Sequence, residues 1–391
     1  MSRTRAERTA GVRSATRLPS LTGMRFGAAF LVFTTHVAVS RPFADQGADD
    51  ELAKWLGRAG FLGVSFFFTL SGFVLTWSAR PGERLLPFWR RRLMKIFPNN
   101  VVAWLAGLLL MLGVGKQVTA GQLVPSLLLV HGWFPQMAIV GGTNGSTWSL
   151  ACELAFYLLF PWLLRLVRRI PERWLWGAAG LVIVAMWLVP LAARLLPSEP
   201  SSPFQSVPWW RYWFTYFFPG TRVLDFLLGI VAARLVLSGR WIGPRLGPAL
   251  LLLVPGYLLM ALLPDAFGLV APTAVPIVLV IAAAATRDAA HNRTFFAGRT
   301  MVWLGEVSFA FYLVHFLVVA YGPLHMASGD PAAGPTWSVP GMLAVSLASF
   351  LVSLVLSWAL YSLVEKPAMR AWGRRRERPG RTSAPSVGPT R

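Results

Sequence analysis

The chain contains a long series of apolar segments, and most are close to the length needed to cross a lipid bilayer. About 30 Å of hydrocarbon takes roughly 20 helical residues, because a helix rises about 1.5 Å per residue. We therefore predict an all-α, polytopic bundle of transmembrane helices. The segments cover residues 21–40, 58–79, 98–115, 122–134, 147–164, 174–193, 212–237, 246–263, 268–286, 301–322 and 338–364.

Composition favours a membrane protein over a chain of soluble domains. Of the 391 residues, 55% are hydrophobic and only 14% are charged, whereas a soluble domain carries about 25% charged residues. Too few polar side chains are present to cover two or three soluble cores. The 18 Trp and 26 Phe residues suit membrane interfaces and lipid-facing surfaces.

Basic residues fall mainly on one side of the predicted bundle. Both tails and alternate loops hold 30 of the 37 Lys and Arg residues, and only seven lie on the other side with the acidic cluster at 45–51. Lys and Arg gather in cytoplasmic loops of membrane proteins. We therefore place both termini in the cytoplasm and the chain in the inner or plasma membrane of the cell. The formal net charge of +21 is explained by topology, so no nucleic-acid partner is expected.

The segment 122–134 is too short to span the bilayer. Because its neighbours 98–115 and 147–164 already carry the chain outward and back, it must begin and end on the outer side. We interpret it as a re-entrant or interfacial piece, which leaves about ten spans. The domain organisation predicted from these features is a disordered cytoplasmic tail over 1–20, a membrane domain over 21–367, and a second disordered cytoplasmic tail over 368–391.

Several kinds of chemistry are excluded or unsupported by the sequence. Cys152 is the single cysteine, which excludes an intramolecular disulfide, a Cys-rich zinc site and a Cys-ligated iron–sulfur cluster. The sequence contains neither an HExxH motif nor a Walker-type phosphate loop. We expect no metal cofactor.

Ionisable residues inside the spans are candidate functional residues, because charge is costly in lipid. Arg25 and His36 share the first span and are eleven residues, or three helical turns, apart. They therefore lie on nearly the same face, about 16 Å apart along the axis, with His36 in the outer half. A hydrogen-bonded core histidine is the alternative interpretation of His36.

Three further groups of polar residues occupy other spans. Glu153 shares a helix face with Tyr157, and Arg222 is spaced to pair with Asp225. His315 lies in the outer half of its span, one turn above Tyr312. By sequence position, Glu153 and Asp225 also fall in the outer half. Structural alternatives remain open: an ion pair inside the bundle for Arg222 and Asp225, and a brace for the re-entrant segment for Glu153.

A basic cluster lies at the cytoplasmic face, in the loop predicted over 80–95 and level with Arg25. Arg and Lys are natural ligands of phosphate groups, so the cluster suggests an anionic donor that binds from the cytoplasm. Ordinary positive-inside charge is the alternative explanation. The cluster consists of Arg90, Arg91, Arg92 and Lys95.

At these residues the sequence resembles the integral-membrane acyltransferase family 3. The resemblance extends from about Leu18 to Pro367, and it combines motifs that are weak singly but specific in this order. Lys95 stands where the basic motif of the family has its second arginine. The motifs are Arg25-x10-His36, the run 66–73 ending in Ser-Gly-Phe, the basic run 91–98, the Trp-Ser-Leu-x-x-Glu stretch 148–157, Arg222-x-x-Asp225, Tyr312-x-x-His315 and Glu365-Lys366-Pro367.

The resemblance implies an O-acyltransferase that moves an acyl group, often acetyl, from acyl-CoA to a hydroxyl of a glycan, an antibiotic sugar or a similar acceptor. A neutral imidazole suits the removal of the hydroxyl proton, and we assign His36 as the general base. Glu153 is the second candidate catalytic residue. Arg25, Arg91, Arg92 and Lys95 are candidates for donor binding. Substrate binding or structural support is expected from Ser71, Trp148, Ser149, Tyr157, Arg222, Asp225, Tyr312 and His315.

Two rival functions are compatible with a polytopic chain. A transporter or flippase of an anionic lipid or solute would also use many spans and buried charges, although no inverted internal repeat is visible. A structural assembly subunit would leave Arg25 and His36 without a role. Within the acyltransferase hypothesis, direct transfer and a covalent acyl-enzyme on Ser71 or Ser149 are both open.

Overall fold

The computed structural model describes residues 17–40, 45–80, 82–202, 206–326 and 337–373. Within these residues the chain is helical, and its β-structure is limited to one isolated bridge between Ser201 and Pro208. The prediction of an all-α protein is confirmed. Residues 1–16 and 374–391 of the two predicted tails lie outside the described residues.

The helices follow one another with short connections. Those of the N-terminal half are α2 (Pro19–Val39), α3 (Gln46–Leu56), α4 (Ala59–Ser78), α5 (Leu85–Gly113), α6 (Ala120–Leu127), η1 (His131–Trp133), α7 (Met137–Gly141), α8 (Trp148–Arg169), η2 (Glu172–Trp174) and α9 (Leu175–Ala193). Those of the C-terminal half are α10 (Trp209–Tyr212), η3 (Trp213–Phe217), α11 (Pro219–Leu237), α12 (Leu246–Leu251), α13 (Leu253–Leu262), η4 (Asp265–Gly268), α14 (Ala271–Ala289), η5 (Phe295–Ala297), α15 (Arg299–Tyr321), α16 (Pro323–Met326), α17 (Val339–Leu360), η6 (Tyr361–Glu365) and α18 (Lys366–Gly373).

Seven stretches of the described chain are long and apolar enough to cross a membrane. The remaining three predicted spans are also helical but are more polar or shorter. Helix α2 has 21 residues, α11 has 19 residues with three charged side chains, and the apolar helix over Leu246–Leu262 is shorter than a typical span. The helical membrane bundle is therefore clear, and the number of ten spans stays a prediction.

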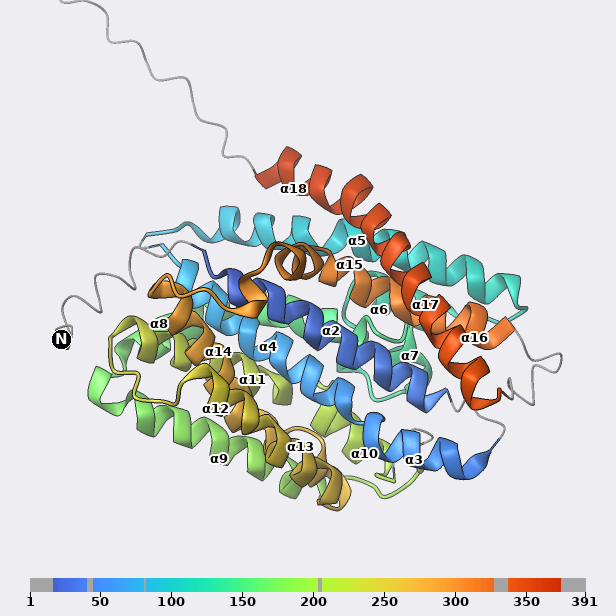
Figure 1. Cartoon of the computed structure of the whole chain (residues 1–391), viewed down its shortest axis with the longest axis horizontal. Coiled ribbons are helices and arrows are strands. Elements are labelled where there is room, and N and C mark those ends of the chain that lie inside the picture. Colours follow the sequence, from blue (N-terminus) through green and yellow to red (C-terminus); the bar gives the residue numbers. More distant parts are fainter. Residues whose placement is uncertain (1–16, 41–44, 81, 203–205, 327–336, 374–391) are drawn as a thin grey trace, which may run out of the picture.

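Helices α2 and α4 run through the middle of the bundle, between α5 and α17 on one side and α9, α12 and α13 on the other (Figure 1). The outer helices expose rows of leucine and valine. Helix α17 continues into α18, and only 17% of the 18-residue apolar segment of this stretch is buried. Such surfaces suit contact with lipid. The 18-residue apolar segment of the stretch that contains α4 is 83% buried, so the centre of the bundle is a protein core.

Glycines allow the central helices to touch backbone to backbone. A Cβ atom added at Gly72 of α4 would clash with the Phe226 carbonyl of α11, and one added at Gly229 of α11 would clash with the Thr69 carbonyl of α4. Small residues at helix crossings permit this close approach in membrane bundles. The Ser-Gly-Phe motif thus places α4 directly against the helix that carries Arg222 and Asp225.

The segment between α5 and α8 is broken into short pieces. Helix α6 has eight residues, which span about 12 Å, and it ends just before Leu129, whose φ is +57°. Leu129 and His131 are fully buried by neighbouring helices. This geometry agrees with the interpretation of residues 122–134 as a re-entrant or interfacial piece that does not span the membrane.

Two boundaries differ from the sequence predictions. The loop predicted over 80–95 is helical from Leu85 onward, because α5 continues for 29 residues with Pro98 in its interior. At the other end, α18 extends the helical chain to Gly373, beyond the predicted boundary at 367. Both extensions contain basic as well as apolar residues, a composition that suits a membrane surface.

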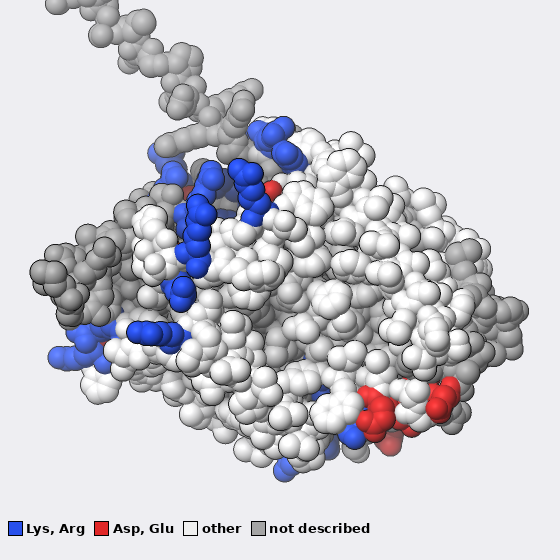
Figure 2. All heavy atoms as spheres, in the orientation of Figure 1, with Lys and Arg blue, Asp and Glu red and all other residues white. Residues whose placement is uncertain are grey.

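Charge is segregated on the molecular surface. In the view of Figure 2, most visible Lys and Arg residues gather at the end near α18, and Asp and Glu gather at the opposite end, over α3. Helix α3 carries Asp49, Asp50 and Glu51. This separation of charge agrees with the division of basic and acidic residues from which cytoplasmic termini were predicted.

The predicted orientation can be tested by thiol labelling, because Cys152 is buried and the chain offers no competing surface thiol. Gln117→Cys and Ser198→Cys occupy exposed positions on the side predicted to be external, and Arg173→Cys occupies an exposed position on the other side. We expect a membrane-impermeant maleimide to label the first two in intact cells and the third only after permeabilisation. Labelling of Arg173→Cys in intact cells would show that the orientation is opposite to the predicted one.

Candidate functional site

A small cavity lies between the central helices. Its polar lining comes from Arg25 of α2, Ser149 and Glu153 of α8, and Tyr312 of α15, and phenylalanine side chains of α4 and α15 complete the wall. Arg25 and Glu153 therefore share one cavity, which corrects the expectation that Glu153 lies at a different depth. The broken segment before α8 is the physical reason, because α8 starts inside the bundle rather than at its outer surface.

The basic end of α5 contributes two side chains to this cavity region. Lys95 is half-buried and interacts electrostatically with Arg25, Arg92 and Glu153. Arg92 lies over the ring of Tyr157, with 5.9 Å between the guanidinium carbon and the ring centroid. Three cations and one carboxylate thus meet where α2, α5 and α8 converge.

Arg91 does not join this group. Its side chain is exposed and forms an ion pair with Glu83. Consecutive residues of a helix point about 100° apart, so the helical conformation of α5 turns Arg91 away when it turns Arg92 inward. The structure therefore separates two residues that the sequence grouped together as donor ligands.

Glu153 is held by neighbours on its own helix and on α4. The hydroxyl of Tyr157 donates a hydrogen bond to Glu153 Oε2 at 3.3 Å, which is the contact expected for residues four apart. Ser71 of α4 in turn interacts with the Tyr157 hydroxyl. The sequence-predicted residues Ser71, Glu153 and Tyr157 are therefore in one place.

Glu365 is a second carboxylate beside Lys95, and sequence analysis did not select it as a site residue. It is buried, acts electrostatically on Lys95, and accepts a hydrogen bond from Asn99 Nδ2 at 2.8 Å. Glu365 ends η6, a π-helical turn that rotates the residues after α17. The Glu-Lys-Pro motif was visible in the sequence, but the buried position of Glu365 depends on this π-helical turn.

Tyr312 connects the cavity to the broken segment before α8. Its hydroxyl donates to the Ser146 carbonyl at 3.1 Å and accepts from the Ser149 hydroxyl at 2.9 Å. Asn144, one residue of a glycosylation sequon, is buried and donates to the Leu313 carbonyl at 2.8 Å. These bonds attach the broken segment and the start of α8 to α15.

His36 and His315 form a direct pair at the far side of Tyr312. Nδ1 of His36 lies 2.9 Å from Nε2 of His315, across the interface between α2 and α15. The ring centroid of Tyr312 is 5.7 Å from that of His315. The cavity at Arg25 and the histidine pair are therefore connected through Tyr312, and the two predicted histidines meet although 279 positions separate them.

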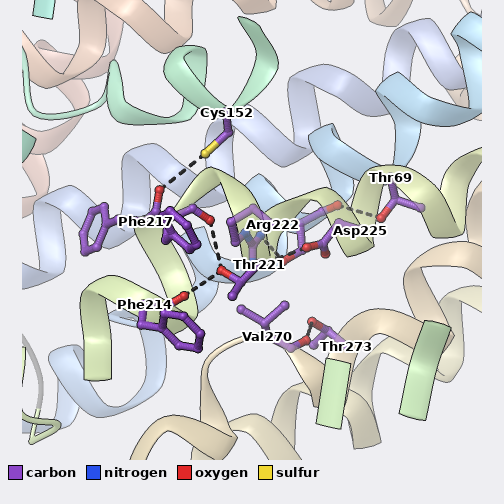
Figure 3. A network of polar contacts seen from close by, with 11 residues as sticks. Thr69, Cys152, Phe214, Phe217, Thr221, Arg222, Asp225, Val270 and Thr273 are labelled. Atoms are coloured by element: carbon purple, nitrogen blue, oxygen red, sulfur yellow. Dashed lines mark hydrogen bonds and ion pairs between the residues drawn. The ribbon is translucent and has the colours of Figure 1, made fainter. Parts of the chain in front are cut away.

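Arg222 and Asp225 lie in a separate place, in the interior against α4 and η3 (Figure 3). Arg222 Nη1 is 3.5 Å from Asp225 Oδ2, and Arg222 Nη2 donates to the Ser65 hydroxyl at 2.9 Å. The Arg222 guanidinium also stacks over Phe68 and Tyr216. Trp148 packs on the same aromatic residues of η3 and α4. These contacts support the structural interpretation of Arg222, Asp225 and Trp148.

Among the described residues, no group of three or more His, Cys, Asp and Glu side chains could hold a metal ion. The polar groups that converge on the cavity are instead cations, one carboxylate and hydroxyls. Such a set suits the binding of a phosphorylated molecule more than that of a metal.

Comparisons with known proteins agree with the resemblance seen in the sequence. A family model described as an acyltransferase domain matches residues 18–362. Acyltransferase MdmB of Streptomyces mycarofaciens is 40% identical over 365 residues, which cover 92% of this chain and 94% of MdmB. Peptidoglycan O-acetyltransferase OatA of Listeria monocytogenes is 24% identical over 343 residues, 77% of this chain but only 49% of OatA. A putative O-acetyltransferase of Staphylococcus aureus is 22% identical over 315 residues, and again about half of its length is covered. No solved structure matches the chain.

Proposed function

Because this chain belongs to the acyltransferase-domain family and is an O-acyltransferase of the membrane, we propose that it takes the acyl group from acyl-CoA and that His36 is its general base. The observation that carries the proposal is the connection of the cationic group at Arg25 to the histidine pair through Tyr312. A donor bound at the basic end then directs its acyl group toward the imidazole.

The donor is recognised by charge. CoA carries several phosphates, and charge-assisted hydrogen bonds from Arg and Lys are the strongest ordinary contacts to them. Arg92 and Lys95 lie at the basic end of α5, and Arg25 lies deeper in the cavity. In this proposal Arg92 and Lys95 hold the phosphates, and Arg25 contacts the donor between them and His36.

The transfer step needs a base and an exit for one proton. The acceptor hydroxyl gives its proton to His36 as its oxygen bonds to the thioester carbonyl carbon. The carbon–sulfur bond then breaks, and the proton passes from His36 to the departing CoA sulfur. Glu153, held by Tyr157, orients the substrate or balances the cations beside it.

The acceptor is a hydroxylated molecule, namely a glycan, an antibiotic sugar or a similar compound. The name of the Listeria relative specifies peptidoglycan, whereas that of the Streptomyces relative specifies only an acyltransferase. The chain aligns with half of the Listeria protein and with nearly all of MdmB, so peptidoglycan is one acceptor class to test rather than the assigned one.

Arg92→Ala should weaken acyl-CoA binding about tenfold or more, because a charge-assisted hydrogen bond contributes about 1.5–3 kcal/mol. The measurement is titration of purified protein with acetyl-CoA. Arg91→Ala is the matched control, since it removes the same charge from the neighbouring position but faces Glu83 at the surface. If both variants lose the same affinity for acetyl-CoA, the effect comes from general surface charge. If both variants keep full affinity, Arg92 is not part of the donor site.

A further inference from the structure

The hydrogen bond between the two histidines has a defined direction. Nδ1 of His315 lies 3.0 Å from the carbonyl oxygen of Phe311, one turn earlier on α15. A carbonyl oxygen only accepts, so Nδ1 of His315 carries the hydrogen. The state of the other nitrogen, Nε2, then depends on whether the ring is neutral or charged.

The surroundings of His315 favour a neutral ring. The side chain is fully buried, stacks on Phe311 with 5.7 Å between ring centroids, and is edged by Phe33 at 6.4 Å. A cation in such an apolar position is costly unless it is paired. The contacts of its two nitrogens are a carbonyl and another imidazole rather than a carboxylate. Nε2 of His315 therefore holds a lone pair.

The state of His36 follows from that of His315. Since Nε2 of His315 accepts, Nδ1 of His36 donates across the 2.9 Å bond and carries the hydrogen. Nε2 of a neutral His36 is then the nitrogen with the free lone pair. The His36 ring is only partly buried.

We propose that His315 is a positioning residue that holds His36 as the Nδ1–H tautomer, so that Nε2 of His36 is the basic atom. This inference rests on the proposed function, in which His36 takes the hydroxyl proton. During transfer the acceptor O–H bond breaks, the proton bonds to Nε2, and the Nδ1–H bond to His315 is retained. The proton then leaves Nε2 for the CoA sulfur, and His315 itself neither gains nor loses one.

Two amide variants separate positioning from packing. The terminal amide of glutamine reaches the place of Nε2 in histidine, so His315→Gln can present its oxygen to Nδ1–H of His36. The shorter asparagine reaches only the place of Nδ1, so His315→Asn can keep the Phe311 contact but loses the one to His36. His291→Gln, at an exposed loop position, is the control for loss of a histidine.

The assay follows release of the CoA thiol from acetyl-CoA by the full chain in detergent or liposomes, with soluble muropeptides, glycosylated antibiotics or water as acceptor. We expect His315→Asn and His315→Ala to lower kcat about 10–100-fold, by analogy with the loss of a residue that orients a metal-bound histidine. KM for acetyl-CoA should stay unchanged, and His315→Gln should recover most of the lost kcat. The His291→Gln control should behave like the unmodified chain.

Other outcomes are equally decisive. Equal activity of the Gln and Asn variants, whether high or low, would overturn the positioning role, as would a loss that appears in KM alone. Acetyl-CoA titration and a thermal melt of each variant identify any that fails to fold, and the Gln–Asn comparison is then made on the folded fraction. Absence of thiol release by the unmodified chain, or full activity of a His36→Gln variant, would instead overturn the proposed function.

Discussion

His36→Ala is expected to lower acyl transfer by about 10²–10⁴-fold, the contribution of a well-placed general base. An alcohol is not ionised near neutral pH, so its attack on a thioester needs proton removal as the new bond forms. His36 lies in contact with His315 at the end of the polar connection from Arg25. The measurement is CoA release at saturating donor, which reports the chemical step.

The loss should be confined to chemistry. Membrane insertion and acetyl-CoA affinity should stay close to those of the unmodified chain, because the cationic group lies on other turns of α2 and on α5. His36→Gln should fail as well, since glutamine keeps the size and hydrogen bonding of histidine but cannot take up the proton. Near-normal turnover by His36→Gln would show that residue 36 only orients the substrate. The general base would then be His315 or Glu153.

Much of the fold could be predicted from hydropathy because the bilayer allows few solutions. A helix of suitable length and apolar composition is the ordinary way to cross it, so the segments of the chain predict the helices directly. The same reasoning identified 122–134 as too short to span. It could not predict that α8 therefore starts inside the bundle, and for that reason it placed Glu153 too far from Arg25.

The candidate site was less predictable, because its residues meet through tertiary structure. Spacing placed Arg25 and His36 on one face, but nothing local indicated that His315 would contact His36. Treating 80–95 as a loop made Arg91 and Arg92 equivalent, whereas a helix turns them to different sides. Glu365 reaches Lys95 by way of a π-helical turn, which no hydrophobic pattern encodes.

Asp225→Ala should destabilise the protein by about 3–5 kcal/mol, which is the largest effect on stability that we expect. The substitution leaves the Arg222 guanidinium in the core with one hydrogen bond, to Ser65, and two aromatic rings as its other contacts. Arg222→Met should be comparably harmful, because it leaves the Asp225 carboxylate without its cation. Thermal unfolding in detergent, followed by tryptophan fluorescence, provides the measurement.

The double variant Arg222→Met with Asp225→Leu decides why the single variants fail. Replacement of a buried ion pair by apolar residues of similar volume is often neutral, because the desolvation of both charges no longer opposes folding. A small cavity also adjoins this pair, and Thr215 lines it with a hydroxyl that has no hydrogen-bond partner among the residues that the structure describes. We expect the double variant to be more stable than either single variant and to retain CoA release. A stable double variant without activity would assign Arg222 and Asp225 to the reaction, because packing would then be restored and only their chemistry would be missing.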